Sequence, residues 1–131
     1  MTREIKFRAK VKHHDPMRNP ENGWVEGFYF QDLTQGEMRS YIFQPPCSWE
    51  VIPETVGQFT GLLDKNGKEI WEHDIVDWDG VMLVVEFVDG GFCMHENYEG
   101  ATLHDLFFER NEINVIGNVF DNLELLEGGA E

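Results

Sequence analysis

The densest group of side chains that could do chemistry is an acidic segment in the second half of the chain. Five carboxylates and one imidazole fall within eleven residues: Glu69, Glu72, His73, Asp74, Asp77 and Asp79. Such a group could hold a divalent cation, since hard cations take several oxygen ligands. In an extended chain, however, Glu72 and Asp74 point to the side opposite the other three carboxylates. A solvated strand edge, charged against aggregation, explains the same residues, so we predict no metal site.

The cysteines and histidines give a weaker chemical signal. Cys47 and Cys93 are too few for a disulfide framework and form no Cys-x-x-Cys pair, so we expect two buried, reduced thiols. Cys93 and His95 could be two ligands or a nucleophile pair, and His104 follows in sequence. His13 and His14 are adjacent and would point to opposite faces of a strand. The sequence contains no hydrolase, phosphate-loop or metalloprotease motif. We therefore predict no enzyme, no catalytic residue and no cofactor.

The first segment alternates between apolar and basic residues. Ile5, Phe7, Ala9 and Val11 alternate with Lys6, Arg8, Lys10 and Lys12, which predicts a strand with one apolar and one basic face. Residues 1–20 carry a charge of +4, whereas residues 21–131 carry -19. We expect the basic face to pair with acidic groups of the same chain or of a second copy. A nucleic-acid contact is the less favoured interpretation, because the pattern lacks aromatic stacking partners and the whole chain has a charge of -15.

Composition favours a mainly β fold. The chain has 131 residues with 10 Phe, 4 Trp and 13 Gly, which suits strands joined by tight turns and one domain of ordinary size. It has no apolar run long enough to cross a membrane and no signal peptide at its start, so we expect the protein in the cytoplasm.

Strand patterns and turn residues divide the chain into two parts. An N-terminal antiparallel β unit is expected over residues 1–52, and a small barrel or roll with one or two short helices over 53–131, the two packed together. Pro45 to Gly57 is the expected boundary region. Asn66-Gly67, Asp79-Gly80 and Asp89-Gly90 predict tight hairpin turns in the second part. The strands are expected at Trp24–Phe30, Met38–Phe43, Phe59–Leu63, Lys68–Trp71, Ile75–Trp78, Val81–Val88, Phe92–His95 and Ile113–Phe120, and a capping box predicts a helix over Thr102–Phe108.

Three blocks of this sequence resemble the YopX family of phage and prophage proteins. They are RxIKFRA at Arg3–Ala9, TVGQFTGLLDKNGKEIWEHDIV at Thr55–Val76 and NVIGNVFDNLELL at Asn114–Leu126. The resemblance implies a β protein of a phage or prophage whose C-terminal part is an SH3-like barrel. It brings no activity and no catalytic residue. One position departs from the family, which usually carries glycine where this chain has His73. The residues between Val11 and Ile52 match no block of the family that we identify.

Two functions of different kinds follow. The chain has more aromatic residues than one small core hides, and some of them are expected to seal the two halves while others form a partner surface. The first hypothesis is therefore an accessory protein that acts through protein contacts, with a host protein or by self-association. The alternative is an acidic DNA mimic that blocks a host nucleic-acid-binding protein. A metal-dependent phosphodiesterase is a distant third. The aromatic residues in question are Trp24, Phe28, Phe30, Trp49, Trp71, Trp78, Phe107 and Phe108.

Overall fold

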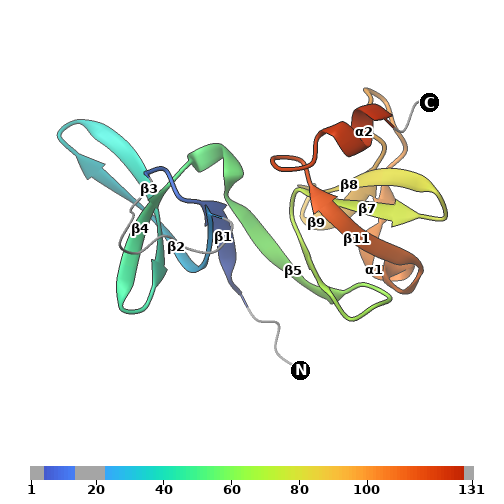
Figure 1. The fold of residues 1–131 in the computed structure, drawn as a ribbon, viewed down its shortest axis with the longest axis horizontal. Helices are drawn as coiled ribbons and strands as arrows, with labels where there is room; N and C mark the ends of the chain where they lie inside the picture. The colour runs from blue at the N-terminus through green and yellow to red at the C-terminus, as the bar shows by residue number, and fades with distance from the viewer. Residues whose placement is uncertain (1–4, 14–22, 129–131) are drawn as a thin grey trace. The chain divides into compact units, whose positions relative to one another are not determined.

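A computed structural model describes residues 5–13 and 23–128 of the chain, without the side chains of Phe108 and Glu127. His14, one of the two adjacent histidines, lies outside the described residues. The protein is mainly β, as predicted, and divides into two compact units, Met1–Phe59 and Thr60–Glu131 (Figure 1). The described residues contain no helix that is long and apolar enough to cross a membrane.

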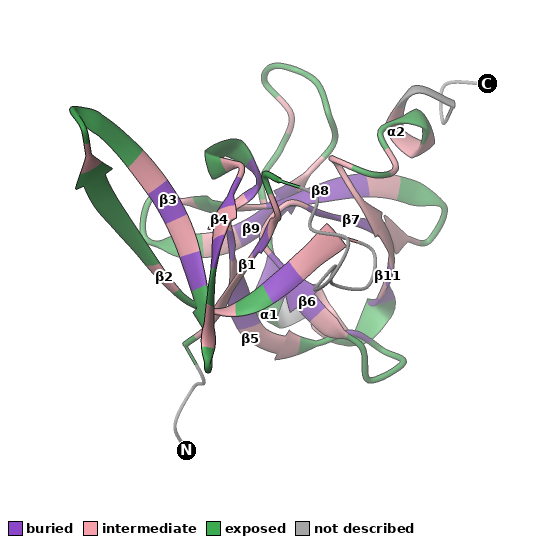
Figure 2. Ribbon diagram, turned by 60° about the vertical axis from the view of Figure 1, so that its left-hand side comes forward, coloured by how far each residue is buried: buried purple, intermediate pink, exposed green. Residues whose placement is uncertain are grey.

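The first unit is an antiparallel sheet. Its strands have the order β4-β3-β2-β1-β5. Their bounds are β1 Phe7–Lys10, β2 Trp24–Thr34, β3 Glu37–Gln44, β4 Cys47–Val51 and β5 Gly57–Leu63, with a short 3-10 helix at Pro53–Thr55. β2 and β3 form a long hairpin whose tip is exposed (Figure 2). Both strands extend beyond the predicted bounds towards the turn at Gln35 and Gly36.

The sheet of the first unit closes on itself. Val11 bridges to Val51, the amide of Ile52 donates to the Lys10 carbonyl at 2.9 Å, and that of Lys12 donates to Glu50 at 2.9 Å. The enclosed core contains Ala9, Val25, Ile42, Trp49 and Val51. Ile5, predicted on the apolar face of the first strand, lies outside β1 and is 61% exposed. Closure packs one face of the strands around this core and leaves the other facing outwards, whereas the tip of the β2–β3 hairpin is exposed on both faces.

The segment expected to separate the two parts belongs largely to the first unit. Pro45 and Pro46 form a two-residue turn, after which β4 pairs with β3 from Cys47 onwards. Proline has no backbone N–H, so it interrupts strand pairing only at positions that must donate a hydrogen bond. The two turn positions do not have to donate one. The unit boundary lies between Phe59 and Thr60, within β5, compared with the expected 52/53.

The second unit contains a five-stranded antiparallel sheet of order β10-β9-β8-β7-β11. Its elements are β6 Glu69–Trp71, β7 Asp74–Trp78, β8 Val81–Val88, β9 Gly91–His95, β10 His104–Asp105, α1 Leu106–Glu109, a 3-10 turn at Arg110–Glu112, β11 Ile113–Asn118 and α2 Glu124–Gly128. β6 lies beside β5. The core is apolar: Ile70, Val76, Leu83, Val85, Met94, Leu106, Ile113 and Val115. The SH3-like class of this part stays a prediction.

Turn chemistry was the most accurate guide to this unit. Asp79 and Gly80 have φ values of 51° and 89°, and Asp89 and Gly90 have 50° and 86°. Two successive positive φ angles are what a tight hairpin requires, so these predicted turns are confirmed. The helix predicted over Thr102–Phe108 was placed to start too early in the chain. The chain is extended through β10, and Asp105 Oδ1 accepts the Phe107 amide at 2.9 Å, which starts α1 at Leu106.

Candidate functional site

The acidic segment does not assemble into a site. Asp74 is buried and its Oδ2 accepts the Trp71 amide at 2.7 Å. Asp77 accepts the Gly80 amide at 2.8 Å, and Asp79 occupies the hairpin turn itself. Within residues 5–13 and 23–128, no group of three or more His, Cys, Asp or Glu side chains is placed to hold a metal ion. The three aspartates instead shape turns between short strands.

His73 occupies a backbone conformation that favours glycine. Its φ is 77°, a left-handed value that costs an ordinary residue about 1–2 kcal/mol. Its amide donates to the Val85 carbonyl at 2.8 Å and its carbonyl accepts from Val119 at 3.0 Å, which fixes this conformation. The ring meets Phe120 edge-on at 5.2 Å. The glycine that the resemblance implies at this position would adopt the same backbone without strain, whereas His73 adopts it with its ring packed against Phe120.

Asp64 is a buried carboxylate that the sequence analysis did not single out. Its Oδ1 accepts the amides of Asn66 at 2.8 Å and Lys68 at 2.9 Å, and its Oδ2 accepts the Val115 amide at 2.8 Å. Burial alone would raise the pKa of Asp64, but these three N–H groups stabilise the charged form and lower its pKa. An aspartate two residues before Asn-Gly is the signal that could have identified it, because such a side chain caps the turn that follows.

Cys93, His95 and His104 form no nucleophile or ligand set. Cys93 is buried as expected, whereas Cys47 is only half-buried. Burial, followed by the charges of Glu86, Asp105 and Asp89, raises the pKa of the Cys93 thiol. A thiol of raised pKa is a poor nucleophile at neutral pH. His95 pairs with Glu86. Burial opposes protonation of His95, but the Glu96 carbonyl and Glu86 outweigh it and raise the pKa of the imidazole. His104 packs against Trp78 with ring centroids 4.7 Å apart.

The outer face of the first unit carries a group of aromatic side chains. Register and alternation place Phe28 and Phe30 of β2 on the same face as Tyr41 and Phe43 of β3, with Phe28 opposite Phe43 and Phe30 opposite Tyr41. Phe28 is 61%, Phe30 40% and Phe43 37% exposed. The Phe30 and Tyr41 rings stack at 5.1 Å and 11°. We call these four residues the aromatic patch.

Cations lie on this outer face beside the aromatic patch. Arg8 and Lys10 of β1 are paired with Glu26 and Trp24 of β2, on the face that Phe28 shares. The Arg8 guanidinium lies 4.9 Å and Lys10 Nζ 5.8 Å from the Trp24 ring centroid. Lys6 Nζ lies 4.9 Å from the ring centroid of Phe59 and 3.9 Å from Glu26. The predicted basic face therefore exists, and it includes the aromatic partners that the sequence pattern had not revealed.

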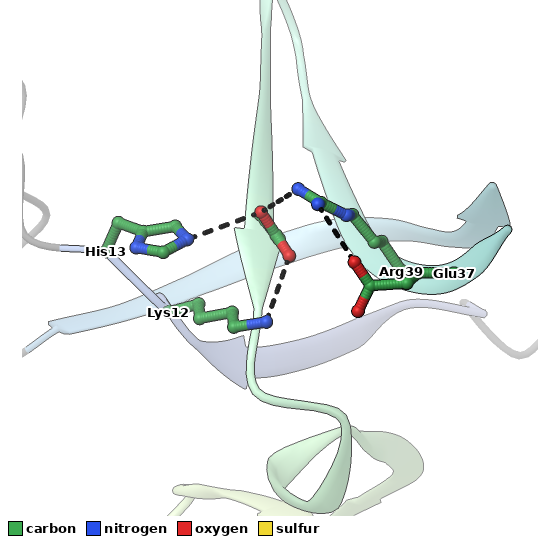
Figure 3. A network of polar contacts seen from close by, with 5 residues as sticks. Lys12, His13, Glu37 and Arg39 are labelled. Carbon is green, nitrogen blue, oxygen red and sulfur yellow. Dashed lines mark hydrogen bonds and ion pairs between the residues drawn. The ribbon is translucent and has the colours of Figure 1, made fainter. Parts of the chain in front are cut away.

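Glu50 gathers three basic side chains on the same outer face. Lys12 lies 3.3 Å, His13 3.5 Å and Arg39 3.6 Å from its carboxylate oxygens, and Arg39 also approaches Glu37 at 3.5 Å (Figure 3). Together with Lys6 and Glu26, these contacts confirm that the basic strand pairs in part with acidic groups of its own chain.

The predicted aromatic residues have different environments. Trp49 and Trp71 are buried in the cores of the first and second units. Trp24 and Trp78 are half-buried, while Phe28, Phe30 and Phe107 are exposed. The side chain of Phe108 lies outside the described part. Sequence reasoning missed Tyr41 and Phe43, which join the patch only through the cross-strand register of β2 and β3.

Comparison with known proteins places this geometry in context. A family model described as "YopX protein" matches residues 6–127, which includes the stretch between Val11 and Ile52 where the sequence showed no recognisable block. The chain is similar in fold to the crystal structure of protein EF1440 from Enterococcus faecalis, with a TM-score of 0.53 and 24% sequence identity over 95% of this chain and 99% of that one. No curated protein sequence matches the chain.

Proposed function

The chain belongs to the YopX protein family, and we propose that it is a phage or prophage accessory protein that acts by binding a macromolecule, not by catalysis. Its binding surface is the outer face of the first unit. The proposed place of action is the cytoplasm of the bacterial host. The candidate chemical groups support binding over catalysis, since Asp64, Asp74 and Asp77 are engaged in turns and the Cys93 thiol has a raised pKa.

The aromatic patch is the observation that carries this proposal. Phe28, Phe30 and Phe43 expose 61%, 40% and 37% of their surface next to one another on paired strands. A contiguous apolar group of this kind gains free energy when a partner covers it, and aromatic residues are enriched where partners bind. Scattered single apolar residues need no such explanation. The pairing of four aromatic side chains across two strands is what distinguishes this surface.

The sequence led us to expect a host protein or a second copy as the partner. Self-association has electrostatic support, because residues 1–59 have a net charge of -1 and residues 60–131 of -14. The acidic unit of one copy could meet the basic outer face of another. The DNA-mimic alternative has less support. Several carboxylates that would have to imitate phosphates are occupied in turns or buried, including Asp64, Asp74, Asp77 and Asp105.

Capture from host lysate tests whether the outer face binds anything. The full-length protein and its Phe28→Ala/Phe30→Ala variant are immobilised and the bound protein and nucleic acid are identified. We expect a macromolecule retained by the wild type and lost by the variant. Tyr98→Ala, which removes an aromatic residue that is 60% exposed in the second unit, is the matched control and should retain it. Equal capture by wild type and the patch variant would contradict the proposal.

A further inference from the structure

We propose that the outer face of the first unit binds single-stranded nucleic acid, with bases on the aromatic patch and phosphates on the neighbouring cations. This inference rests on the proposed function, because it names the partner of that same surface. It reverses the expectation from the sequence that nucleic acid is the less favoured partner, which was based on the lack of aromatic residues within the basic strand. The structure supplies them: Trp24 beneath Arg8 and Lys10, and four further rings across β2 and β3.

The spacing of the aromatic patch suits separate bases. Phe28 and Phe30 are two residues apart on one strand, which is about 6.6 Å. That distance is about twice the 3.4 Å rise between stacked bases, so a strand bound across both rings has its bases unstacked and each base lies on a ring. Base-on-aromatic stacking is available to single strands alone, because the faces of bases inside a duplex are already covered. The patch therefore favours a single strand over a duplex.

The cations flank the rings on the same face. Arg8 and Lys10 lie on β1, next to the segment of β2 that leads into Phe28 and Phe30. On the far side of the patch, Arg39 pairs across the strands with Asp32. A row of cations beside stacking rings can follow a phosphate backbone, while the rings take bases without reading their identity. The expected binding is therefore sequence-tolerant and weakened by salt.

The charge distribution confines the ligand to the first unit. The whole-chain charge of -15 argued against nucleic acid, but residues 60–131 account for -14 of it. The outer face itself has Lys6, Arg8, Lys10, Lys12 and Arg39 against Glu26, Asp32, Glu37 and Glu50, which leaves a net charge of +1. The outer face, with its small positive charge, is therefore more favourable for phosphates than the second unit, which repels them.

Fluorescence anisotropy with the full-length protein tests the proposal. The probes are labelled oligothymidylate of about 12 nucleotides, within the usual site size for such surfaces, the corresponding RNA, and a DNA duplex of the same length. We expect both single strands to bind and the duplex to bind more weakly. Neutralising about three phosphates predicts a loss of roughly 20-fold in affinity when salt rises from about 50 to 200 mM.

Three variants separate the rings from the cations. Phe28→Ala/Phe30→Ala should weaken binding at least about fivefold, the lower end of what one stacked base contributes. Tyr98→Ala should leave it unchanged. Glu50→Gln removes the carboxylate that engages Lys12 and Arg39, and should strengthen binding. Circular dichroism and thermal melting check that each variant is folded, which the exposure of both phenylalanines leads us to expect.

Sedimentation of the same samples separates failure of this inference from failure of the proposed function. No binding of either single strand, or equal binding by the patch variant, overturns the nucleic-acid proposal. If in that case the wild type self-associates and Phe28→Ala/Phe30→Ala does not, the outer face is an interface between copies and the proposed function stands. If the patch variant also behaves like the wild type in sedimentation and lysate capture, both proposals fail.

Discussion

Glu50 in the first unit and Asp64 in the second are both carboxylates with three polar partners, yet their partners differ in kind. Glu50 is surrounded by Lys12, His13 and Arg39 at 3.3 to 3.6 Å. Asp64 accepts three backbone amides at 2.8 to 2.9 Å. Side chains must be immobilised to make an ion pair, whereas backbone N–H groups are already fixed by the fold. Asp64 is therefore a structural group, whereas Glu50, although its own side chain is only 14% exposed, is held by basic side chains that are 35–70% exposed and adjustable.

The two units differ in the same way. In the second unit, carboxylates at Asp64, Asp74 and Asp77 hold turns by accepting backbone amides, within or next to the block that resembles the YopX family. In the first unit, charges and rings gather on an outer face that belongs mostly to strands outside the resembling blocks. The outer face therefore lies mostly outside the recognisable blocks, although the family match as a whole spans residues 6–127 and includes it. A recognisable motif is a poor guide to the binding surface here.

The largest effect is expected from breaking the Asp64 cap. Asp64→Ala leaves three backbone N–H groups without their acceptor: that of Val115, whose hydrogen bond is buried, and those of Asn66 and Lys68 in the adjoining turn. The loss should cost about 3 kcal/mol of unfolding free energy. Asp77→Ala, which removes one exposed hydrogen bond to Gly80, is the matched control and should cost under about 1 kcal/mol. Urea denaturation measures both. Equal losses of unfolding free energy in the two variants would show that Asp64 stabilises the fold no more than Asp77 does.

The Asp64 cap also predicts a pH dependence. The pKa of Asp64 is lowered in the folded state, so the folded protein binds fewer protons there than the unfolded chain. Its contribution is present above the unfolded pKa of about 3.9 and is lost as pH falls through the lower folded value. Asp64→Asn should therefore flatten the acid limb of stability, measured by urea denaturation between about pH 6 and pH 2. An unchanged acid limb would contradict the assignment.

A smaller effect is expected at His73. With φ at 77°, glycine relieves strain that alanine retains, and both lose the contact with Phe120. His73→Gly should therefore be more stable than His73→Ala by about 0.5–1 kcal/mol. The neighbouring Glu72 has no positive φ, since the described non-glycine residues that have one are Gln35, His73, Asp79 and Asp89. At Glu72, therefore, the alanine variant should be more stable than the glycine variant. Thermal denaturation of the four variants tests this, and a stabler alanine at 73 would refute it.

Local patterns predicted the fold where turn chemistry and alternation were decisive. A tight hairpin turn needs positive φ at both of its central residues, and Asp79-Gly80 and Asp89-Gly90 supply it. In β1, the alternation of Phe7 and Ala9 with Arg8 and Lys10 predicted the strand. The aromatic patch could not be predicted in full, because Tyr41 and Phe43 join Phe28 and Phe30 through a register that no local pattern sets. Alternation also gives no measure of exposure, which depends on how the sheet closes.

The smallest effect on stability is expected from Glu50. Glu50→Gln removes the carboxylate that contacts Lys12, His13 and Arg39. These three side chains are 35–70% exposed, so solvent weakens each contact although Glu50 itself is only 14% exposed. The variant should lose no more than about 1 kcal/mol at low salt, and the loss should shrink as salt screens the charges in the wild type. Urea denaturation at two salt concentrations measures this, with exposed Glu54→Gln as the control in the same unit. A loss as large as that of Asp64→Ala, insensitive to salt, would mean that Glu50 is a structural group as well. In that case the cations around it would be fixed by the fold, and the outer face would have fewer charges to offer a ligand.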